Sequence, residues 1–246
     1  MKSDLKILSY NIHKGFALSR RFVLDSMRTM IRKTEAEIVF LQEVQGDHNG
    51  HAKRIENWPG AQFEYLADEV WPHFAYGKNA IYDAGHHGNS ILSKYPILSF
   101  ENIDISNNRF ERRGILHATV DWADGPLHLL CVHLDLTAHG RRQQVSRIAD
   151  RIRSHIKEGE RIILAGDFND WRKQVTPVFR EQLGLKEVFL EKYGHYAKSF
   201  PALFPLLTLD RVYTRGFETK EAHCHSDPPW SNLSDHCAIE TTLRKI

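Results

Sequence analysis

Short runs of β-type residues recur along the whole chain, and they limit its fold more than any other sequence feature. The runs are β-branched or alternating in hydropathy and are bounded by Gly, Pro, Asn or Asp, which is typical of strands. They cover residues 5–12, 37–41, 89–93, 97–105, 114–122, 127–134, 161–165, 208–213, 219–223 and 237–243. Two longer segments, residues 19–33 and 138–156, instead repeat apolar residues at the spacing of one helix face. Many strands with a few one-sided helices predict an α+β sandwich, in which helices flank two stacked sheets.

Length and charge bound the classes of protein that this chain can belong to. The 246 residues are 41% apolar, which is enough for a hydrophobic core and excludes disorder as the main state. No low-complexity segment, linker or repeat divides the chain, so we expect one domain over residues 1–246. The net charge of +2 excludes a strongly basic coat for nucleic acid, although it leaves room for a local basic patch.

The cysteines and the apolar runs bear on the compartment. Cys131, Cys224 and Cys237 show no CxxC spacing, so we expect neither a disulfide framework nor a cysteine zinc site. The N-terminus has no signal-peptide core, and no stretch reaches the roughly 18 apolar residues of a membrane span. These features predict a cytoplasmic protein without stable membrane insertion.

Acids, amides and histidines gather where the expected strands end. They are Asn11, His13, Glu43, His133, Asp167, Asn169, Asp235 and His236. A strand that is buried on both faces can end in such residues only where its backbone meets water or a site. Each residue alone also has an ordinary explanation, such as a solvated strand end, a turn, a helix cap or a satisfied core histidine. Asp210 is harder to explain in this way, because an acid between Leu209 and Val212 needs a hydrogen-bond donor.

The order of these motifs is more specific than any one of them. Along the chain they read YNIHKG, LQEV, GNSILS, RRGIL, VHL, RRQQ, GDFND, LDRVY and SDH. This series resembles the endonuclease/exonuclease/phosphatase superfamily over nearly the whole chain, from about Lys6 to Thr241. The resemblance implies a four-layered αββα sandwich of the DNase I type, with two mixed β-sheets between helices and a site at one edge. It also implies a divalent-metal-dependent hydrolase that cleaves phosphate esters.

The resemblance implies a metal site for Mg²⁺, with Mn²⁺ as a plausible substitute. Glu43 is the expected principal ligand and Asp235 a further one, since hard cations prefer carboxylate and carbonyl oxygens. Asn11 either joins the metal shell or holds Glu43 in place. Some endonucleases of the superfamily carry an acid where this chain has His13. We expect His13 to contact the substrate phosphate, with a softer metal ligand or an exposed loop residue as the alternatives.

Five residues carry the expected catalytic roles. Asp167 orients or deprotonates the attacking water, and Asn169 binds a non-bridging phosphoryl oxygen. His236 donates a hydrogen bond to the phosphoryl group or acts as acid or base, and Asp210 holds that imidazole and raises its pKa. His133 is a second phosphate donor. The sequence leaves open whether His236 or Asp167 takes the proton of the water.

Two further residues are expected to contact the substrate. Asn89 lies where relatives place an amide that faces the substrate or approaches the backbone. Arg113, with its neighbour Arg112, is suited to clamp a phosphate, because a guanidinium binds two oxygens at once. The alternative for the arginine pair is a solvated turn before a strand.

The class of phosphate ester is the least constrained prediction. Nucleic acid is the first expectation, because the resemblance to the superfamily implies it. The segment 58–87 is rich in aromatic residues and histidines, which either stack bases or pack as an ordinary loop. The alternative is a phospholipid headgroup or an inositol phosphate, for which an exposed apolar loop around Trp230 is the candidate contact. A binding module that has lost turnover is the third hypothesis, and the intact set of acids and histidines argues against it.

Overall fold

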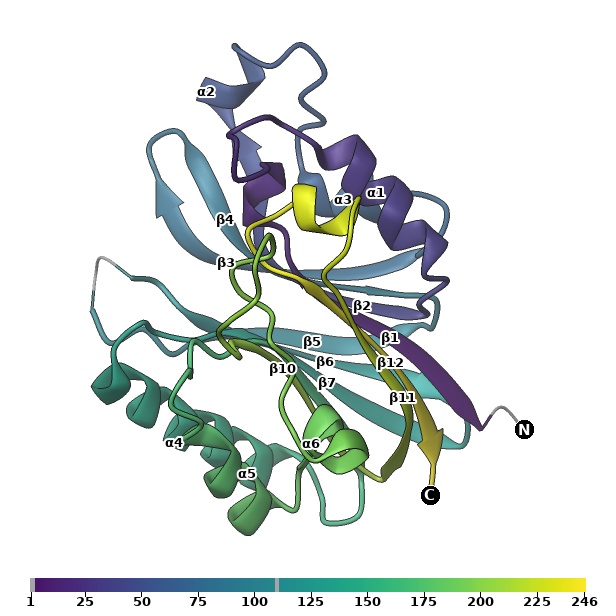
Figure 1. The fold of residues 1–246 in the computed structure, drawn as a ribbon. Helices are drawn as coiled ribbons and strands as arrows, with labels where there is room; N and C mark the ends of the chain where they lie inside the picture. The colour runs from purple at the N-terminus through teal and green to yellow at the C-terminus, as the bar shows by residue number, and fades with distance from the viewer. Residues whose placement is uncertain (1–2, 109–110) are drawn as a thin grey trace.

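The computed structural model describes residues 3–108 and 111–246, and it has the four layers that the sequence predicts. Two six-stranded mixed sheets lie face to face, with helices on both outer sides (Figure 1). The first sheet has the order β11 (Phe217–His225), β12 (Ala238–Lys245), β1 (Asp4–Asn11), β2 (Ile38–His48), β4 (Gly85–Ser93) and β3 (His73–Tyr82). The second has the order β5 (Ile97–Asp104), β6 (Gly114–Trp122), β7 (Gly125–His133), β8 (Arg161–Asp167), β10 (Asp210–Arg215) and β9 (Lys186–Glu187).

Helices cover the outer faces of the sheets. Those beside the first sheet are α1 (Leu24–Lys33), α2 (Asn49–Ala52) and α3 (Gln62–Ala67), as Figure 1 shows. Those beside the second sheet are α4 (Ala138–His155) and α5 (Val175–Leu183), and α6 (Val188–Tyr193) packs against β10 and β11. The two predicted helices correspond to α1 and α4. Within the described residues, no helix has the length and apolar character needed to cross a membrane.

Successive side chains of β1 alternate between two apolar cores, one on each face of the first sheet. Leu5 and Ile7 belong to the apolar core between the sheets, whereas Leu8 and Tyr10 belong to the core beneath α1. Successive strand side chains point to opposite faces, so a strand covered on both sides reads as a nearly continuous apolar run. Asn11 at the end of β1 is fully buried as well, so its amide needs polar partners within the protein.

The register of the second sheet aligns predicted site residues in one row. His133 at the end of β7 pairs with Asp167 at the end of β8 in a parallel ladder. Asp210 at the start of β10 pairs with the same Asp167 in an antiparallel ladder. The three side chains therefore come from neighbouring strands at one edge of the sheet. This placement follows from strand pairing, which brings together residues far apart in sequence.

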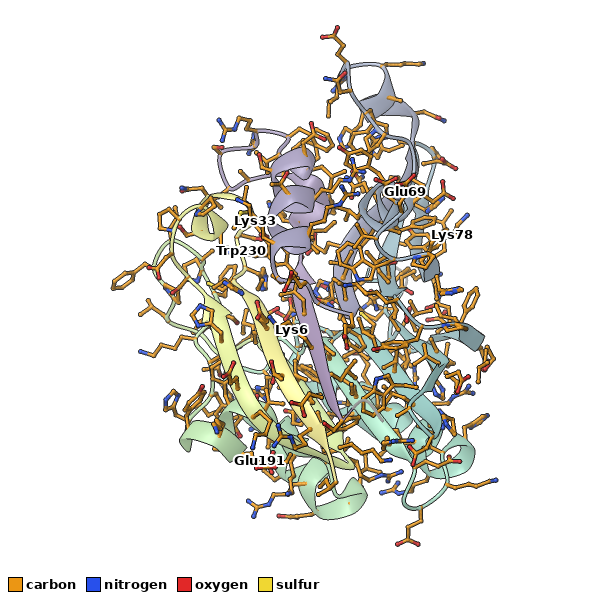
Figure 2. The ribbon with its side chains drawn as sticks, turned by 90° about the vertical axis from the view of Figure 1, so that its right-hand side faces the viewer. Lys6, Lys33, Glu69, Lys78, Glu191 and Trp230 are labelled. Atoms are coloured by element: carbon orange, nitrogen blue, oxygen red, sulfur yellow. The ribbon has the colours of Figure 1, made fainter. Side chains whose placement is uncertain are left out.

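Two features of the aromatic-rich segments differ from the sequence expectation. The segment 58–87 contains α3 and the edge strand β3, and Trp71 is buried with its indole N–H donating to the carbonyl of Ala36. Trp230 is also buried, in edge-on contact with Tyr10 and stacked on His225. Figure 2 shows Trp230 at the end of the molecule that carries Lys33 of α1, opposite Glu191 of α6. The expectation of an exposed apolar loop at Trp230 is therefore wrong.

Candidate active site

A cavity of about 410 Å³ opens at the edge where these strand ends meet. The predicted residues that line it are Glu43, Arg113, His133, Asp167, Asn169 and His236. Lys14, His87, Leu136, Trp171, Phe200, Leu207 and Leu209 complete its lining. The cavity lining thus combines acids, cations and imidazoles with several apolar side chains.

Asp167 is the centre of the polar side. Its Oδ2 atom lies 3.4 Å from Nε2 of His133 and 3.7 Å from Nε2 of His236, and it accepts a hydrogen bond from Nδ2 of Asn11 at 3.3 Å. Its Oδ1 atom accepts from the backbone N–H of Asn169 at 2.9 Å. The carboxylate is therefore held by donors on several sides and has a fixed orientation in the cavity wall.

His236 and Asp210 form a buried, hydrogen-bonded pair. Nδ1 of His236 lies 2.8 Å from Oδ2 of Asp210, and that oxygen also accepts from the hydroxyl of Ser199 at 2.6 Å. With Nδ1 engaged in this way, Nε2 of His236 faces Asp167 and the cavity. His236 thus provides the hydrogen-bond donor that the buried carboxylate of Asp210 requires, and this pairing is the one that the sequence predicts.

Burial and charge set the protonation of these groups. Burial opposes the charged form of His236, but the carboxylates of Asp210 and Asp167 outweigh it and raise the pKa of His236 to about 10. Burial raises the pKa of Asp167 to about 6, and the charge on Asp210 adds to this effect while the His236 imidazolium opposes it. Burial holds the pKa of His133 well below its usual value, and Arg113 lowers it further. At neutral pH the cavity therefore presents a cationic His236, a neutral His133 and a mostly ionised Asp167.

Glu43 reaches the cavity because β2 bulges at this point. The pairing of β2 with β4 shifts register between Leu41 and Val44, which inserts one extra residue and re-aims the side chains there. Glu43 has a φ of 55°, a left-handed conformation that is rare for residues other than glycine and that clusters at functional sites. Its Oε2 atom lies 3.7 Å from Nζ of Lys14. Asn169, on the other side of the cavity, also has a positive φ, of 50°.

Asn11 acts as a bridge between two carboxylates. Its Oδ1 atom accepts from the backbone N–H of His13 at 3.1 Å, which fixes the orientation of the amide. Its Nδ2 atom consequently faces Oε1 of Glu43 at 3.5 Å and Oδ2 of Asp167 at 3.3 Å. Of the two predicted roles, this geometry favours holding Glu43 over ligating a metal, because the amide oxygen points away from the carboxylates.

The donor set fits a hard divalent cation at Glu43. Its carboxylate is partly exposed to the cavity, so a cation bound there would keep several waters, as Mg²⁺ does in proteins. Asp167, Asp210 and His236 also offer ligand atoms within 4.8 Å of one another and could hold a metal ion. In that group Nδ1 of His236 and Oδ2 of Asp210 are already hydrogen-bonded at 2.8 Å, whereas the contacts of the Glu43 carboxylate are 3.5 Å or longer and the carboxylate faces the cavity. This geometry favours Glu43 as the metal ligand.

Five predicted residues lie apart from the cavity lining: Asn11 and Asp210, which contact residues that line it, and His13, Asn89 and Asp235. Nδ1 of His13 lies 3.7 Å from Oδ1 of Asp235, so these two residues face each other. Asp235 also accepts from the hydroxyl of Ser234, which in turn donates to the carbonyl of Asn11. Asn89 is buried, and its amide donates to the carbonyls of Gly114 and Cys131, which join the two sheets. This use of the Asn89 amide matches a backbone-approaching role. A metal-ligand role for Asp235 and a substrate contact for His13 stay predictions.

Three further basic residues line the cavity: Arg113, which the sequence predicts, and Lys14 and His87, which it does not single out. Arg113 lines the cavity, whereas Arg112 faces outward, with its guanidinium 3.6 Å from Asp104. Lys14 follows His13 in the first motif, so its place in YNIHKG is the signal that points to it. His87 is partly buried, and this burial lowers its pKa to about 4, so its ring is neutral at pH 7. Nδ1 of His87 has no hydrogen-bond partner among the described residues.

Asn169 is oriented by the neighbouring strand end. Its side-chain amide donates to the carbonyl of Leu134 at 2.9 Å, just beyond β7. Gly166 precedes this segment with a φ of 146°, and a Cβ atom there would overlap the carbonyl of Val132. Glycine therefore permits the close approach of β7 and β8 from which Asp167 and Asn169 enter the cavity.

Comparison with known proteins places the chain in a family that agrees with the geometry of this site. A family model described as the Endonuclease/Exonuclease/phosphatase family matches residues 8–236. The chain belongs to this family. It is also 41% identical over 244 residues to "Uncharacterized protein YbhP" of Escherichia coli (strain K12), covering 98% of this chain and 96% of that protein.

Solved structures share the fold at low sequence identity. An endonuclease/exonuclease/phosphatase protein from Beutenbergia cavernae superposes with a TM-score of 0.79 at 19% identity, covering 99% of this chain and 72% of that one. D. rerio TDP2, solved in complex with a single strand DNA product, has a TM-score of 0.74 at 19% identity and covers 99% and 100% of the two chains. These likenesses support the DNase I-like sandwich.

Proposed function

We propose that this protein is a metal-dependent phosphodiester hydrolase whose active site is the cavity around Asp167. The observation that carries the proposal is the series of Asp210, His236 and Asp167, beside a cavity that also contains Glu43 and Arg113. In this series His236 is hydrogen-bonded to Asp210 and its Nε2 atom lies 3.7 Å from Asp167. Hydrolysis of a phosphate ester requires neutralised phosphoryl oxygens, a positioned water and a route for the proton. Each requirement has a matching group in this cavity.

The electrostatics of the cavity suit an anionic phosphoryl group. Arg113, Lys14 and the protonated His236 supply positive charge around it. A guanidinium binds two phosphate oxygens at once, and an imidazolium Nε2–H donates to a third. His133, kept neutral by burial, is an additional donor in the same wall.

The residues of the same cavity are suited to position the attacking water and to accept its proton. Asp167 is held by donors and is ionised above a pH of about 6, so it is suited to orient the water and accept its proton. His236, held by Asp210, binds the phosphoryl group and stabilises the charge that builds up on it. A divalent cation held by Glu43 would supply Lewis-acid polarisation of the phosphoryl oxygen. Asn11 positions Glu43 and Asp167 relative to each other.

Nucleic acid is one candidate substrate. The structural neighbour D. rerio TDP2 was solved with a single strand DNA product. In this chain, Trp171 is an exposed aromatic residue on the cavity lining that is suited to stack a base. Much of the aromatic segment 58–87, however, is packed into the fold through Trp71 and Tyr76, which removes those rings as a stacking surface.

A panel of phosphate esters tests the proposal. Purified protein is incubated with bis-p-nitrophenyl phosphate, p-nitrophenyl phosphate, plasmid, single-stranded RNA, sphingomyelin and phosphatidylglycerol, each with Mg²⁺, Mn²⁺ or EDTA. We expect metal-dependent release of p-nitrophenolate from the diester. We also expect the Asp167→Asn variant to lose about 10²–10⁴-fold in rate, the usual contribution of a positioned acid or base.

The matched control is Asp150→Asn, which makes the same chemical change at an exposed position of α4. It should leave the rate unchanged. Binding of substrates without turnover of any of them would refute the proposal in favour of a catalytically silent binding module.

A further inference from the structure

An exposed apolar loop stands beside the cavity, between α6 and β10. Leu203, Phe204 and Leu206 expose 60%, 70% and 56% of their surface. Figure 1 shows this segment in light green, beside the yellow segment that precedes β12. The backbone N–H of Ala202 donates to the carbonyl of Asp235, which fixes the two segments side by side. Apolar side chains that gather on a surface in this way mark an interaction site.

The loop has a closed, hydrogen-bonded base. The backbone N–H groups of Leu206 and Leu207 both donate to the carbonyl of Phe200, and the N–H of Ser199 donates to the carbonyl of Leu207. The hydroxyl of Ser199 also donates to Asp210, the residue that holds His236. The exposed apolar tip is therefore attached directly to the catalytic residues and keeps a fixed position relative to them.

The apolar surface continues from the loop to the mouth of the cavity. Leu136, Trp171 and Leu207 line the cavity and are also exposed. With Leu203 and Phe204 they give one side of the cavity an apolar rim. A substrate that enters past this rim has apolar material next to its phosphate.

The segments that form this rim contain cations and no acids. Residues 136–149, 171–180 and 192–209 include no Asp or Glu. Their exposed cationic side chains are Arg142, Arg147, Arg172, Lys173, Arg180, Lys192 and Lys198. Lys173 and Lys198 line one shallow cavity together with Thr208, which places both at the base of the loop. This charge is complementary to an anionic surface, while the apolar tip is complementary to hydrocarbon.

We propose that the loop docks on an anionic phospholipid bilayer and that the cavity takes the phosphodiester headgroup of a lipid. This assignment rests on the proposed phosphodiesterase function and names its substrate class. Apolar side chains that enter the acyl boundary and cations that face the headgroups are the two parts of peripheral membrane binding. Four exposed leucines at the tip and rim, Leu136, Leu203, Leu206 and Leu207, favour lipid over nucleic acid, because aliphatic side chains offer no ring on which a base can stack.

Vesicle flotation tests the docking independently of turnover. The full chain is mixed with vesicles made of equal parts phosphatidylglycerol and phosphatidylcholine, or of phosphatidylcholine alone, and the floating fraction is measured. We expect binding to the anionic vesicles and a loss of roughly tenfold or more in partitioning for Leu203→Ser/Phe204→Ser, since each side chain contributes through its apolar area. Lys173→Glu/Lys198→Glu should also weaken binding, and salt should weaken it further.

Matched controls lie on other surfaces of the chain. Ile81→Ser/Leu98→Ser changes two apolar side chains that are 73% and 62% exposed, on β3 and β5, and should float like the wild type. Lys53→Glu/Lys78→Glu is the corresponding charge control at exposed positions. The Leu203→Ser/Phe204→Ser variant should hydrolyse soluble bis-p-nitrophenyl phosphate at the wild-type rate but lose activity on phosphatidylglycerol in vesicles.

The outcomes separate this inference from the proposed function. Failure of the wild type to float, or equal flotation of the loop variant and the wild type, overturns the docking even if the soluble diester is cleaved. Absence of hydrolysis with intact, loop-dependent flotation supports the docking and refutes the phosphodiesterase function. Loop substitutions that abolish binding of single-stranded DNA, or that dissolve a dimer, while flotation is unchanged would also overturn the lipid assignment.

Discussion

Removing the carboxylate of Asp170 tests the ion pair that joins the end of β8 to the start of β10, next to Asp167 and Asp210. Asp170 follows the GDFN motif after β8, and Arg211 follows Asp210 in β10; both side chains are fully buried. Nη1 of Arg211 lies 3.0 Å from Oδ2 of Asp170, and Nη2 donates to the carbonyl of the same residue at 2.5 Å. Oδ2 of Asp170 also accepts from the backbone N–H of Val175 at the start of α5.

The cost of Asp170→Ala follows from these contacts. The substitution leaves a buried guanidinium without its counterion, which costs about 3–5 kcal/mol of unfolding free energy. For a chain of this size each kcal/mol lowers Tm by about 2–4 °C, so the expected fall is about 6–20 °C. Because Asp170 and Arg211 adjoin Asp167 and Asp210 respectively, kcat should fall as well.

Urea denaturation followed by tryptophan fluorescence and by circular dichroism measures the loss of stability. The informative control adds Arg211→Met to Asp170→Ala, which removes the unpaired charge together with its partner. We expect the double variant to recover at least half of the stability that the single variant loses, since replacing both members of a buried pair is often nearly neutral. A single variant within about 1 kcal/mol of the wild type, or a double variant less stable than the single one, would refute this reasoning.

Three more predictions concern the metal, the His236 pair and pH. Glu43→Gln should weaken Mn²⁺ binding by calorimetry while the unfolding midpoint stays the same, and an unchanged affinity would reject Glu43 as a ligand. Asp210→Asn should lower turnover by about 10²–10⁴-fold because His236 loses its counterion, and wild-type rates at every pH would reject the pair. Burial, with Arg151, lowers the pKa of His117 to about 3 from 6.5, so the folded state resists its protonation. The contribution of His117 to stability should therefore be complete above pH 6.5 and fall by about 2 kcal/mol on acidification to about pH 5. His117→Gln should show a smaller fall over the same range in denaturant titrations, and an equal fall would contradict this assignment.

The strand and helix patterns predict the elements of the fold because they depend on residues close together in sequence. The order of the motifs predicts how these elements are arranged, through the resemblance to a known family. The β-type runs correspond to most of the long strands, and α1 and α4 appear where apolar periodicity places them. The edge strand β3 is missed because HFAYGKNAIY contains Gly and Asn and has a register shift between Lys78 and Ala80. Helices α3 and α6 are six residues long, too short to show a helical period.

The site is predictable where a residue type implies its chemistry. Asp210 needs a donor by virtue of its apolar neighbours, and the structure supplies His236. Nothing in the sequence marks Trp171 or the loop at Phe204 as part of the site surface. Apolar residues are expected in the core, and only the structure shows that these are exposed. The orientation of the Asn11 amide also cannot be predicted from the sequence. Only the hydrogen bond that its oxygen accepts from the N–H of His13 shows that its nitrogen faces Glu43.

Hydrolysis in oxygen-18 water with bis-p-nitrophenyl phosphate and Mn²⁺ tests the central claim most directly, because it reports both turnover and the origin of the attacking oxygen. We predict that the wild type releases p-nitrophenyl phosphate carrying one labelled oxygen and that Asp167→Asn releases almost none in the same time. Equal rates for the two proteins, or a product without the label, would contradict an active site in which Asp167 directs water onto phosphorus.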